Sequence, residues 1–196
     1  MTTIVVSHGY GADSDSVWFP YLRQSLEAHG HQVRIPHLPE NTAPRLASWQ
    51  AVLRACVADT DPRDTVLVRH SIGGVNVLRL LQQHDVDTAG AFAGAVLVAT
   101  PAQVPAGYEA LAEFFAEPFD WPRLRRAANR YRVLTAVDDP VLAPEPPIHH
   151  VKELVTGLQA TAVLTAIGAH YGATPDDHID LPEAVQLVVD CLPAKP

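Results

Sequence analysis

Short apolar runs rich in β-branched residues recur along this chain, and a longer amphipathic stretch follows each of them. The runs cover residues 3–7, 32–35, 65–68, 95–99, 132–136 and 161–166. The stretches with apolar residues at helical spacing cover 18–29, 45–58, 72–84, 121–129, 148–158 and 181–192. Continuous apolar runs of this length are typical of strands buried on both faces. The alternation therefore predicts an α/β fold, with a mostly parallel six-stranded sheet between two layers of helices.

Length and charge limit the function classes. A chain of 196 residues predicts a single domain, 1–196. The formal net charge is −8, and the 14 basic residues form no run, which argues against nucleic acid or an anionic membrane as a partner. The first six residues do not resemble a signal peptide and no apolar run reaches membrane length, so we expect a cytoplasmic protein. The scarcity of lysine relative to arginine suggests a bacterial source.

Proline is unusually frequent, with 17 residues in the chain. Most prolines follow the predicted strands, at the sheet edge where open α/β folds bind ligands. We expect them to stiffen the loops around a binding site. The alternative is that they only end strands and rigidify loops.

The segment 65–74 combines a predicted strand, a turn of small residues and a predicted helix. This is the context of a nucleophile elbow, in which Ser71 would project from a strained turn above the sheet. The amide of Ile72, in the first helical turn, would donate to an oxyanion. Gly73 and Gly74 would let the helix pack closely. An ordinary strand-to-helix turn is the alternative.

One position departs from the elbow pattern G-x-S-x-G, because Arg69 occupies the place of the first glycine. A large side chain there predicts an overpacking cost of about 1–3 kcal/mol or a displaced elbow. Alternatively, the side chain extends outward to solvent. A third consequence would be a permanent cation near the catalytic groups, which would lower the pKa of a neighbouring histidine.

A serine nucleophile needs a base and an acid that orients the base, in the chain order Ser, Asp or Glu, His. Asp139, beyond the fifth strand, is the predicted acid, with Asp138 as its competitor. His170, beyond the sixth strand, is the predicted base, and His178 is the weaker alternative.

A glycine-bearing loop follows the first strand. The amide of Tyr10 in this loop is the predicted second oxyanion donor. A phosphate-binding loop is excluded because the segment has no lysine and lacks the G-x-x-x-x-G-K-[ST] pattern. The dinucleotide pattern G-x-G-x-x-G is also incomplete, since Ser14 stands at its third glycine.

Aromatic residues follow the fourth strand. We expect Phe114, Phe115, Phe119 and Trp121 to form an apolar wall beside Ser71, and Trp18 to contribute to substrate binding. The alternative for each of them is packing in the local core.

Several motifs together resemble the small α/β-hydrolase family of the retinoblastoma-binding-protein serine hydrolases and their bacterial YdeN-like members. They are His8-Gly9-Tyr10-Gly11, Trp18-Phe19-Pro20, His37-Leu38-Pro39, His70-Ser71-Ile72-Gly73-Gly74, Asp138-Asp139-Pro140 and Gly168-Ala169-His170-Tyr171. The resemblance implies a triad of Ser71, Asp139 and His170 and a three-layer hydrolase core with no large cap domain. It also implies activity on ester or related acyl bonds. The family has glycine where this chain has Arg69.

These observations lead to one preferred function and two alternatives. The preferred function is that of a serine hydrolase acting through an acyl-enzyme on a small ester, thioester or related acyl compound, without a metal or organic cofactor. The first alternative is a weakly active or non-hydrolytic enzyme of the same fold that catalyses an elimination or rearrangement. The second is a binding protein without catalytic activity. The sequence does not set the oligomeric state.

Overall fold

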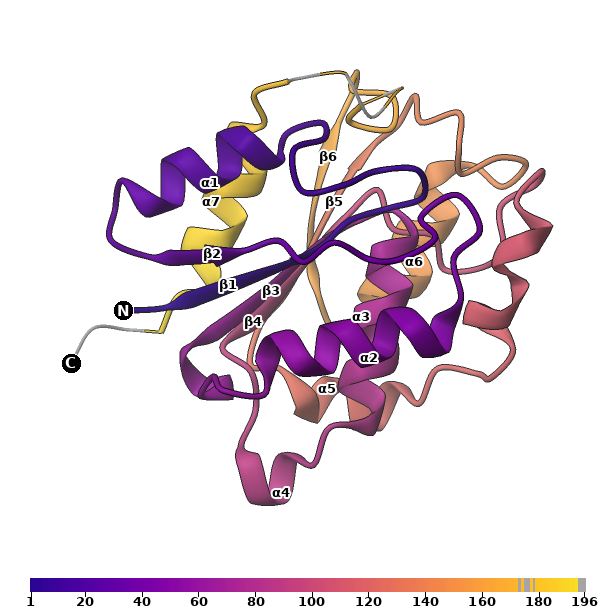
Figure 1. Ribbon diagram of the computed structural model, residues 1–196. Helices are drawn as coiled ribbons and strands as arrows, with labels where there is room; N and C mark the ends of the chain where they lie inside the picture. The colour runs from indigo at the N-terminus through magenta and orange to yellow at the C-terminus, as the bar shows by residue number, and fades with distance from the viewer. Residues whose placement is uncertain (173, 175–176, 178, 194–196) are drawn as a thin grey trace.

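The computed structural model describes residues 1–172, 174, 177 and 179–193. Its centre is a sheet of six parallel strands in the order β2-β1-β3-β4-β5-β6 (Figure 1). The strands are β1 (Thr3–Ser7), β2 (Gln32–Arg34), β3 (Thr65–His70), β4 (Gly94–Val98), β5 (Tyr131–Ala136) and β6 (Thr161–Thr165). The predicted fold class and all six predicted strands are confirmed.

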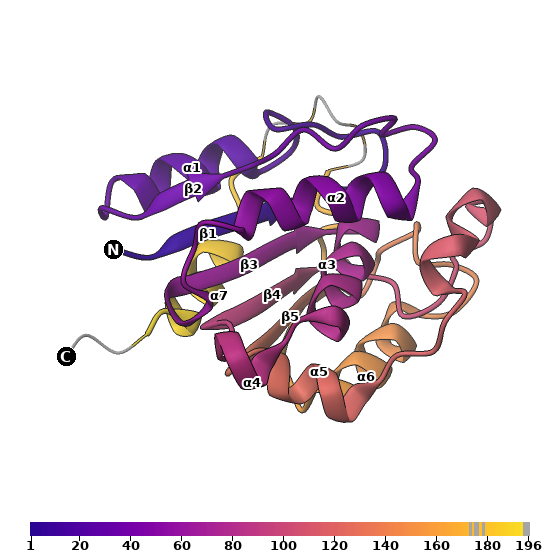
Figure 2. The same cartoon turned by 60° about the horizontal axis from the view of Figure 1, so that its bottom comes forward.

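Helices cover both faces of the sheet (Figures 1 and 2). Helices α1 (Phe19–Glu27) and α7 (Pro182–Cys191) pack on one face. The opposite face carries α2 (Leu46–Val57), α3 (Ile72–Gln83), α5 (Trp121–Ala127) and α6 (Pro147–Leu158). Every residue of β3 and β4 is buried, because these central strands are enclosed by both helical layers. Their continuous apolar sequence follows from this position.

Three short helical segments were not predicted: η1 (Pro62–Asp64), α4 (Val86–Ala89) and η2 (Glu109–Phe115). Each is too short to show a helical period in the sequence. Strand β3 also extends two residues beyond its predicted end, to His70. The elbow therefore begins directly at the end of the strand.

Some of the prolines have a role that the sequence pattern did not predict. Five helical segments, namely α1, η1, α5, α6 and α7, carry proline in their first two positions. Proline suits these positions because the first amides of a helix have no intrahelical acceptor and its fixed φ is helical. Five of the 17 prolines thus serve helix initiation.

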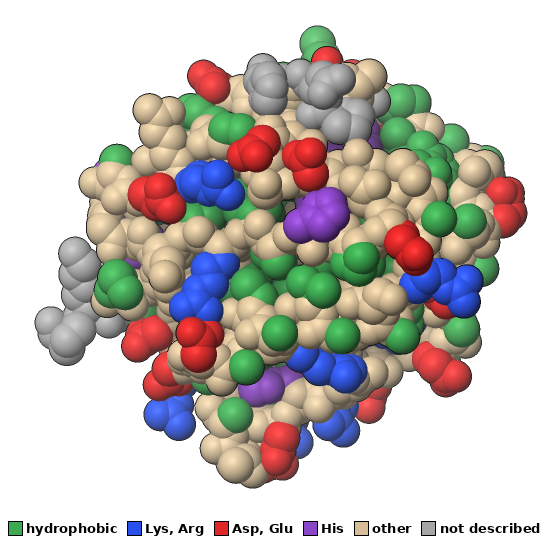
Figure 3. Space-filling model, viewed as in Figure 1, with side chains coloured by type: hydrophobic (Ala, Val, Ile, Leu, Met, Phe, Trp, Pro, Cys, Tyr) green, Lys and Arg blue, Asp and Glu red, His purple; other side chains and the backbone are tan. Residues whose placement is uncertain are grey.

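The surface in Figure 3 shows Lys and Arg side chains scattered among Asp and Glu. Among the described residues, no helix has the length and apolar character needed to cross a membrane.

Candidate active site

Ser71 sits on a strained turn between β3 and α3. Its backbone has φ 54° and ψ −131°, a positive φ that costs energy for a residue with a side chain. The amide of Ser71 donates to the carbonyl of Val98 at 2.9 Å, which fixes the turn to the neighbouring strand β4. Helix α3 begins at the next residue, Ile72. This is the geometry of a nucleophile elbow.

Gly73 and Gly74 allow α3 to approach the sheet at this turn. A Cβ on Gly73 would overlap the backbone carbonyls of Ser7 and His8, and one on Gly74 would overlap the side chain of Thr100. The predicted reason for two glycines after the serine, close helix packing, is confirmed.

His170 and Asp139 meet beyond the carboxyl ends of β6 and β5. The Nδ1 atom of His170 lies 2.8 Å from Oδ2 of Asp139, whose side chain is completely buried. The other oxygen of Asp139 accepts a hydrogen bond from the amide of Val141 at 2.9 Å. The carboxylate is therefore held by its own loop in an orientation that serves the histidine ring.

Asp138 contacts the backbone beside His170 instead of its ring. Its Oδ1 accepts a hydrogen bond from the amide of Ala169 at 2.8 Å. The residues on either side of His170, Ala169 and Tyr171, have φ of 44° and 53°, so this loop is strained. The two neighbouring aspartates thus have different partners. Asp138 holds the backbone of the strained loop, and Asp139 holds the ring of His170.

His70 fixes the same loop from the elbow. Its Nε2 lies 2.7 Å from the carbonyl oxygen of His170, so Nε2 carries the proton and donates it to this bond. The two imidazole rings are 4.9 Å apart. Burial, and secondly the neighbouring His170, lowers the pKa of His70 to about 3. His70 is therefore a neutral donor at ordinary pH.

Arg69 lies on the opposite face of β3 from His70, because successive side chains of a strand alternate. It is fully buried, so the outward extension considered from the sequence is wrong. Its Nη2 reaches back to the carbonyl of Leu67 at 3.4 Å, away from Ser71. The elbow keeps its strained turn, so displacement of the elbow is also wrong.

The guanidinium of Arg69 lies on the other face of β3 from His70 and reaches back toward Leu67. Burial lowers its pKa to about 9, and the titratable groups of Tyr131 and Cys191 only partly oppose this shift. Two of its nitrogens, Nε and Nη1, lack a hydrogen-bond partner among the described residues. Arg69 is thus a buried charge that lowers stability, on the sheet face covered by α2, α3, α5 and α6.

A cavity of about 220 Å³ opens beside Ser71 and His170. Tyr10 and Ile72, the two predicted oxyanion residues, both line it. The remaining wall is largely apolar and includes Val17, Pro101, Pro105, Tyr108, Leu111 and Val141. The cavity thus brings together the elbow, the glycine-bearing loop and the histidine loop, which are far apart in the sequence.

His8 anchors the glycine-bearing loop. Its Nδ1 donates to the carbonyl of Gly9 at 2.9 Å, and its Nε2 accepts the amide of Leu38 at 3.0 Å. Burial lowers the pKa of His8, so the ring stays neutral and can serve both bonds. The loop also approaches the elbow closely, since a Cβ on Gly9 would lie 3.0 Å from Cβ of Ser71.

The predicted aromatic wall is wrong. Among the described residues that line the cavity, none of the five aromatics assigned to substrate binding occurs. Trp18 is fully buried beneath His70, with 6.0 Å between ring centres, and Phe114 packs in the core against Trp49.

The three other aromatics of that set contact neighbouring helices. Phe119 stacks under the guanidinium of Arg79 at 4.3 Å, Trp121 packs on Gly157 of α6, and Phe115 lines a separate hollow near Arg79. The same chain segment instead contributes Tyr108 and Leu111 to the cavity. Tyr108 meets Tyr10 edge to face at 5.7 Å. Sequence spacing could not show which aromatic of the segment faces Ser71.

His150, in α6, is buried. Its Nδ1 accepts the amide of Ala102, and its Nε2 donates to the carbonyl of Leu142, both at 3.0 Å. It therefore joins the loops after β4 and β5. His178 and Pro175 lie outside the described residues. In the part of the chain that the structure describes, no group of three or more His, Cys, Asp or Glu could hold a metal ion.

Comparison with known proteins agrees with this geometry. The family model described as serine hydrolase matches residues 4–189. A Bacillus subtilis protein named as a hydrolase, YdeN, is 29% identical over 168 residues, which cover 86% of this chain and 85% of that protein. The crystal structure of the B. subtilis ydeN product superimposes with a TM-score of 0.87 at 28% identity, covering 97% of this chain and 98% of the other.

An extracellular α/β-hydrolase from a Paenibacillus species shares the fold. It gives a TM-score of 0.66 at 14% identity and covers 99% of this chain and 100% of its own. The sheet order and the two helical layers described above are therefore those of an α/β-hydrolase without a large cap.

Proposed function

This chain belongs to the serine hydrolase family, and from that premise we propose that it cleaves a small ester, thioester or related acyl compound through a triad of Ser71, His170 and Asp139. The observation that carries the proposal is the arrangement at one cavity. Ser71 sits there on a strained elbow, and His170 beside it has its Nδ1 atom 2.8 Å from the buried Asp139 carboxylate.

In the first half of the proposed reaction, Oγ of Ser71 attacks the acyl carbon while His170 takes the serine proton. Asp139 keeps His170 in the Nδ1–H tautomer, which leaves Nε2 free to accept that proton, and it stabilises the charged ring. The amides of Tyr10 and Ile72 donate to the oxyanion that forms on the acyl oxygen. His170 then returns the proton to the leaving group, and the acyl chain remains on Ser71.

Water completes the cycle. His170 removes a proton from a water molecule as that water attacks the acyl-enzyme, and the second oxyanion uses the same two amides. The proton then returns to Oγ of Ser71, and the carboxylic acid leaves.

The cavity supports a small, uncharged acyl group. Its volume of about 220 Å³ is below the roughly 300–1,000 Å³ of sites for drug-sized ligands. Its described lining contains no Asp, Glu, Lys or Arg. An acyl chain would contact Val17, Leu111 and Val141, whereas a charged group would lose water there without gaining a partner.

Covalent labelling tests the proposal. A fluorophosphonate should modify the protein at Ser71, and Ser71→Ala should abolish the adduct. Ser25→Ala, on α1 away from the cavity, is the matched control and should label like the parent protein. A folded parent protein that gives no Ser71 adduct would overturn the proposed chemistry and favour a binding protein.

Ester hydrolysis tests the size of the acyl group. Acetyl and butyryl p-nitrophenyl esters should be cleaved with a higher kcat/KM than the corresponding long-chain esters, because the cavity has room only for a short chain. Equal or higher kcat/KM for long chains would contradict the proposed substrate class while leaving the triad in place.

A further inference from the structure

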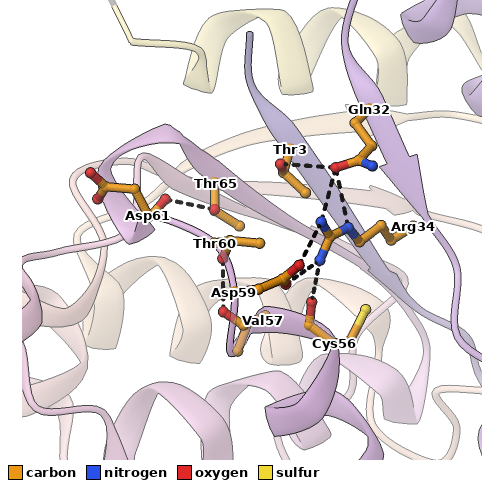
Figure 4. A network of polar contacts seen from close by, with 9 residues as sticks. All are labelled: Thr3, Gln32, Arg34, Cys56, Val57, Asp59, Thr60, Asp61 and Thr65. Atoms are coloured by element: carbon orange, nitrogen blue, oxygen red, sulfur yellow. Dashed lines mark hydrogen bonds and ion pairs between the residues drawn. The ribbon is translucent and has the colours of Figure 1, made fainter.

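The two edges of the sheet are built differently. Strand β2, at one edge, has three residues and carries Arg34, which bridges the edge to the end of α2. Its guanidinium binds the carbonyl of Cys56 at 3.0 Å and the carboxylate of Asp59 at 2.5 Å, while Gln32 accepts from it at 3.0 Å (Figure 4). A short, charged strand of this kind discourages pairing with another chain.

Strand β6, at the other edge, has none of these features. It has five residues, Thr-Ala-Val-Leu-Thr, and lies in a run of sixteen residues without Asp, Glu, Lys, Arg or His, from Leu154 to Ala169. Leu164 in the strand is 45% exposed, and Ile167 just beyond it is 83% exposed. In a chain with net charge −8, this is a segment where two copies can approach without charge repulsion.

The backbone of β6 has a defined open side. The amide of Val137 in the loop after β5 donates to the carbonyl of Thr165 at 2.9 Å, so Thr165 faces the neighbouring strand. Backbone groups alternate in direction along a strand, and the N–H and C=O groups of Ala162 and Leu164 therefore face the open edge. No described strand pairs with β6 on that side.

The geometry points to a second copy of this chain as the occupant of that edge, with the two β6 strands antiparallel about a two-fold axis at Val163. In this register Thr161 faces Thr165 of the other copy, Ala162 faces Leu164, and Val163 faces itself. Ala162 and Leu164 are then the hydrogen-bonded pair, as their backbone orientation requires. A register moved by two residues would leave part of each five-residue strand unpaired.

The sequence of β6 fits this self-pairing. A two-fold interface must be self-complementary. Threonine faces threonine, a pair that is favourable across strands, and the small Ala162 faces the large Leu164. Val163 packs on the face covered by α1 and α7, and Ala162 packs on the face covered by α6. By alternation Thr161 shares the first face and Leu164 the second, so each side of the joined sheet is matched. The dimer would contain one continuous twelve-stranded sheet.

Hydrodynamic measurement tests the dimer. Analytical ultracentrifugation of the parent protein across the micromolar range should give twice the monomer mass of 21.2 kDa. Leu164→Lys should give the monomer mass, because its charge would face the partner strand. Val189→Lys is the matched control, since Val189 is also 45% exposed but lies on α7, and it should remain dimeric. A monomeric parent protein, or a dimeric Leu164→Lys protein, would overturn the inference.

Disulfide formation tests the register. In a Cys56→Ser background, Val163→Cys should cross-link to its own copy on oxidation because the two side chains face each other. Thr161→Cys alone should not cross-link, whereas the double variant Thr161→Cys/Thr165→Cys should. A dimer in which Thr161→Cys cross-links and Val163→Cys does not would show that the copies meet in another way. Thr161→Lys, at an exposed position, provides a second disrupting variant if Leu164→Lys does not fold.

Discussion

Arg69 and His70 are consecutive residues of one strand, yet they belong to different parts of the molecule. His70 lines the cavity and donates a hydrogen bond to the backbone of His170. Arg69 points to the opposite face and reaches back along the strand to Leu67. A departure from the elbow pattern at position 69 is therefore a matter of packing and stability, whereas a change at position 70 affects the geometry of the site.

The largest expected effect concerns the two aspartates, which show the same contrast between a residue that contacts the ring of His170 and one that does not. Asp139→Asn should lower kcat/KM for a short ester by roughly a thousand- to ten-thousandfold, because the histidine would lose its tautomer and its charge partner. Asp138→Asn is the matched control, since it weakens one exposed bond to Ala169, and it should cost about tenfold at most. Steady-state kinetics measure both. Equal losses in the two variants would contradict the separate roles.

Arg69 provides the next test. Arg69→Met should raise the free energy of unfolding by about 1–4 kcal/mol, because an apolar chain of similar length replaces a buried charge with two nitrogens that no described residue hydrogen-bonds. Ester turnover should change by less than about twofold, since the side chain faces away from the cavity. Urea unfolding and steady-state kinetics measure the two effects.

Arg79 is the control for this substitution, because it is also buried but donates to the carbonyls of Phe114, Glu117 and Pro118. Arg79→Met should lower the free energy of unfolding by about 1.5–3 kcal/mol. If Arg69→Met also destabilised the protein, or changed turnover strongly, the separation between the two faces would be wrong.

The pH dependence of stability reports on His70. Its native pKa of about 3 lies below the ordinary value of 6.5, so below pH 6.5 the unfolded chain binds a proton that the native protein excludes. Stability is then complete above pH 6.5 and falls by up to about 1.4 kcal/mol per pH unit toward pH 3. The lowered pKa of His8 adds a loss in the same direction.

Replacing His70 should remove its share of this loss. His70→Gln should flatten the decline in unfolding free energy between pH 6 and pH 4, as measured by urea unfolding at several pH values. His29→Gln, at an exposed position two residues beyond the end of α1, serves as the comparison. A slope unchanged by His70→Gln would mean that His70 is not the neutral buried donor described above.

The smallest expected effect concerns rate. His70→Ala should lower kcat by about tenfold, because the carbonyl of His170 loses its donor and the strained loop can shift. His70→Gln should restore most of the rate, since its amide can donate to the same carbonyl. An equal loss in both variants at unchanged melting temperature would argue against a positioning role through this bond.

Much of the site could be predicted because its signals are local. The strand, the small-residue turn and the helix around Ser71 are contiguous, and the chain order of Asp139 and His170 follows from where strands end. The position in the chain hardly distinguishes Asp138 from Asp139, since both follow β5 closely. The structure separates them because Asp139 contacts the ring of His170 and Asp138 contacts the backbone of Ala169.

The aromatic residues show the opposite case. Phe114 and Tyr108 lie in one short segment, but Phe114 enters the core beside Trp49 while Tyr108 lines the cavity beside Tyr10. Both are large and largely apolar, so composition could not distinguish them. The direction of each ring depends on which helix lies against the segment.

The sequence by itself therefore determined the alternation of strands and helices, the elbow and the order of the catalytic candidates, because periodicity and turn chemistry act over a few neighbouring residues. Only the tertiary structure decided that Arg69 faces the layer of α2, α3, α5 and α6, and that His70 and Asp138 hold the loop of His170. It also decided that β6 lies at the sheet edge, with no described strand paired on its outer side. Each of these depends on contacts between segments distant in the chain, whose packing no local pattern records.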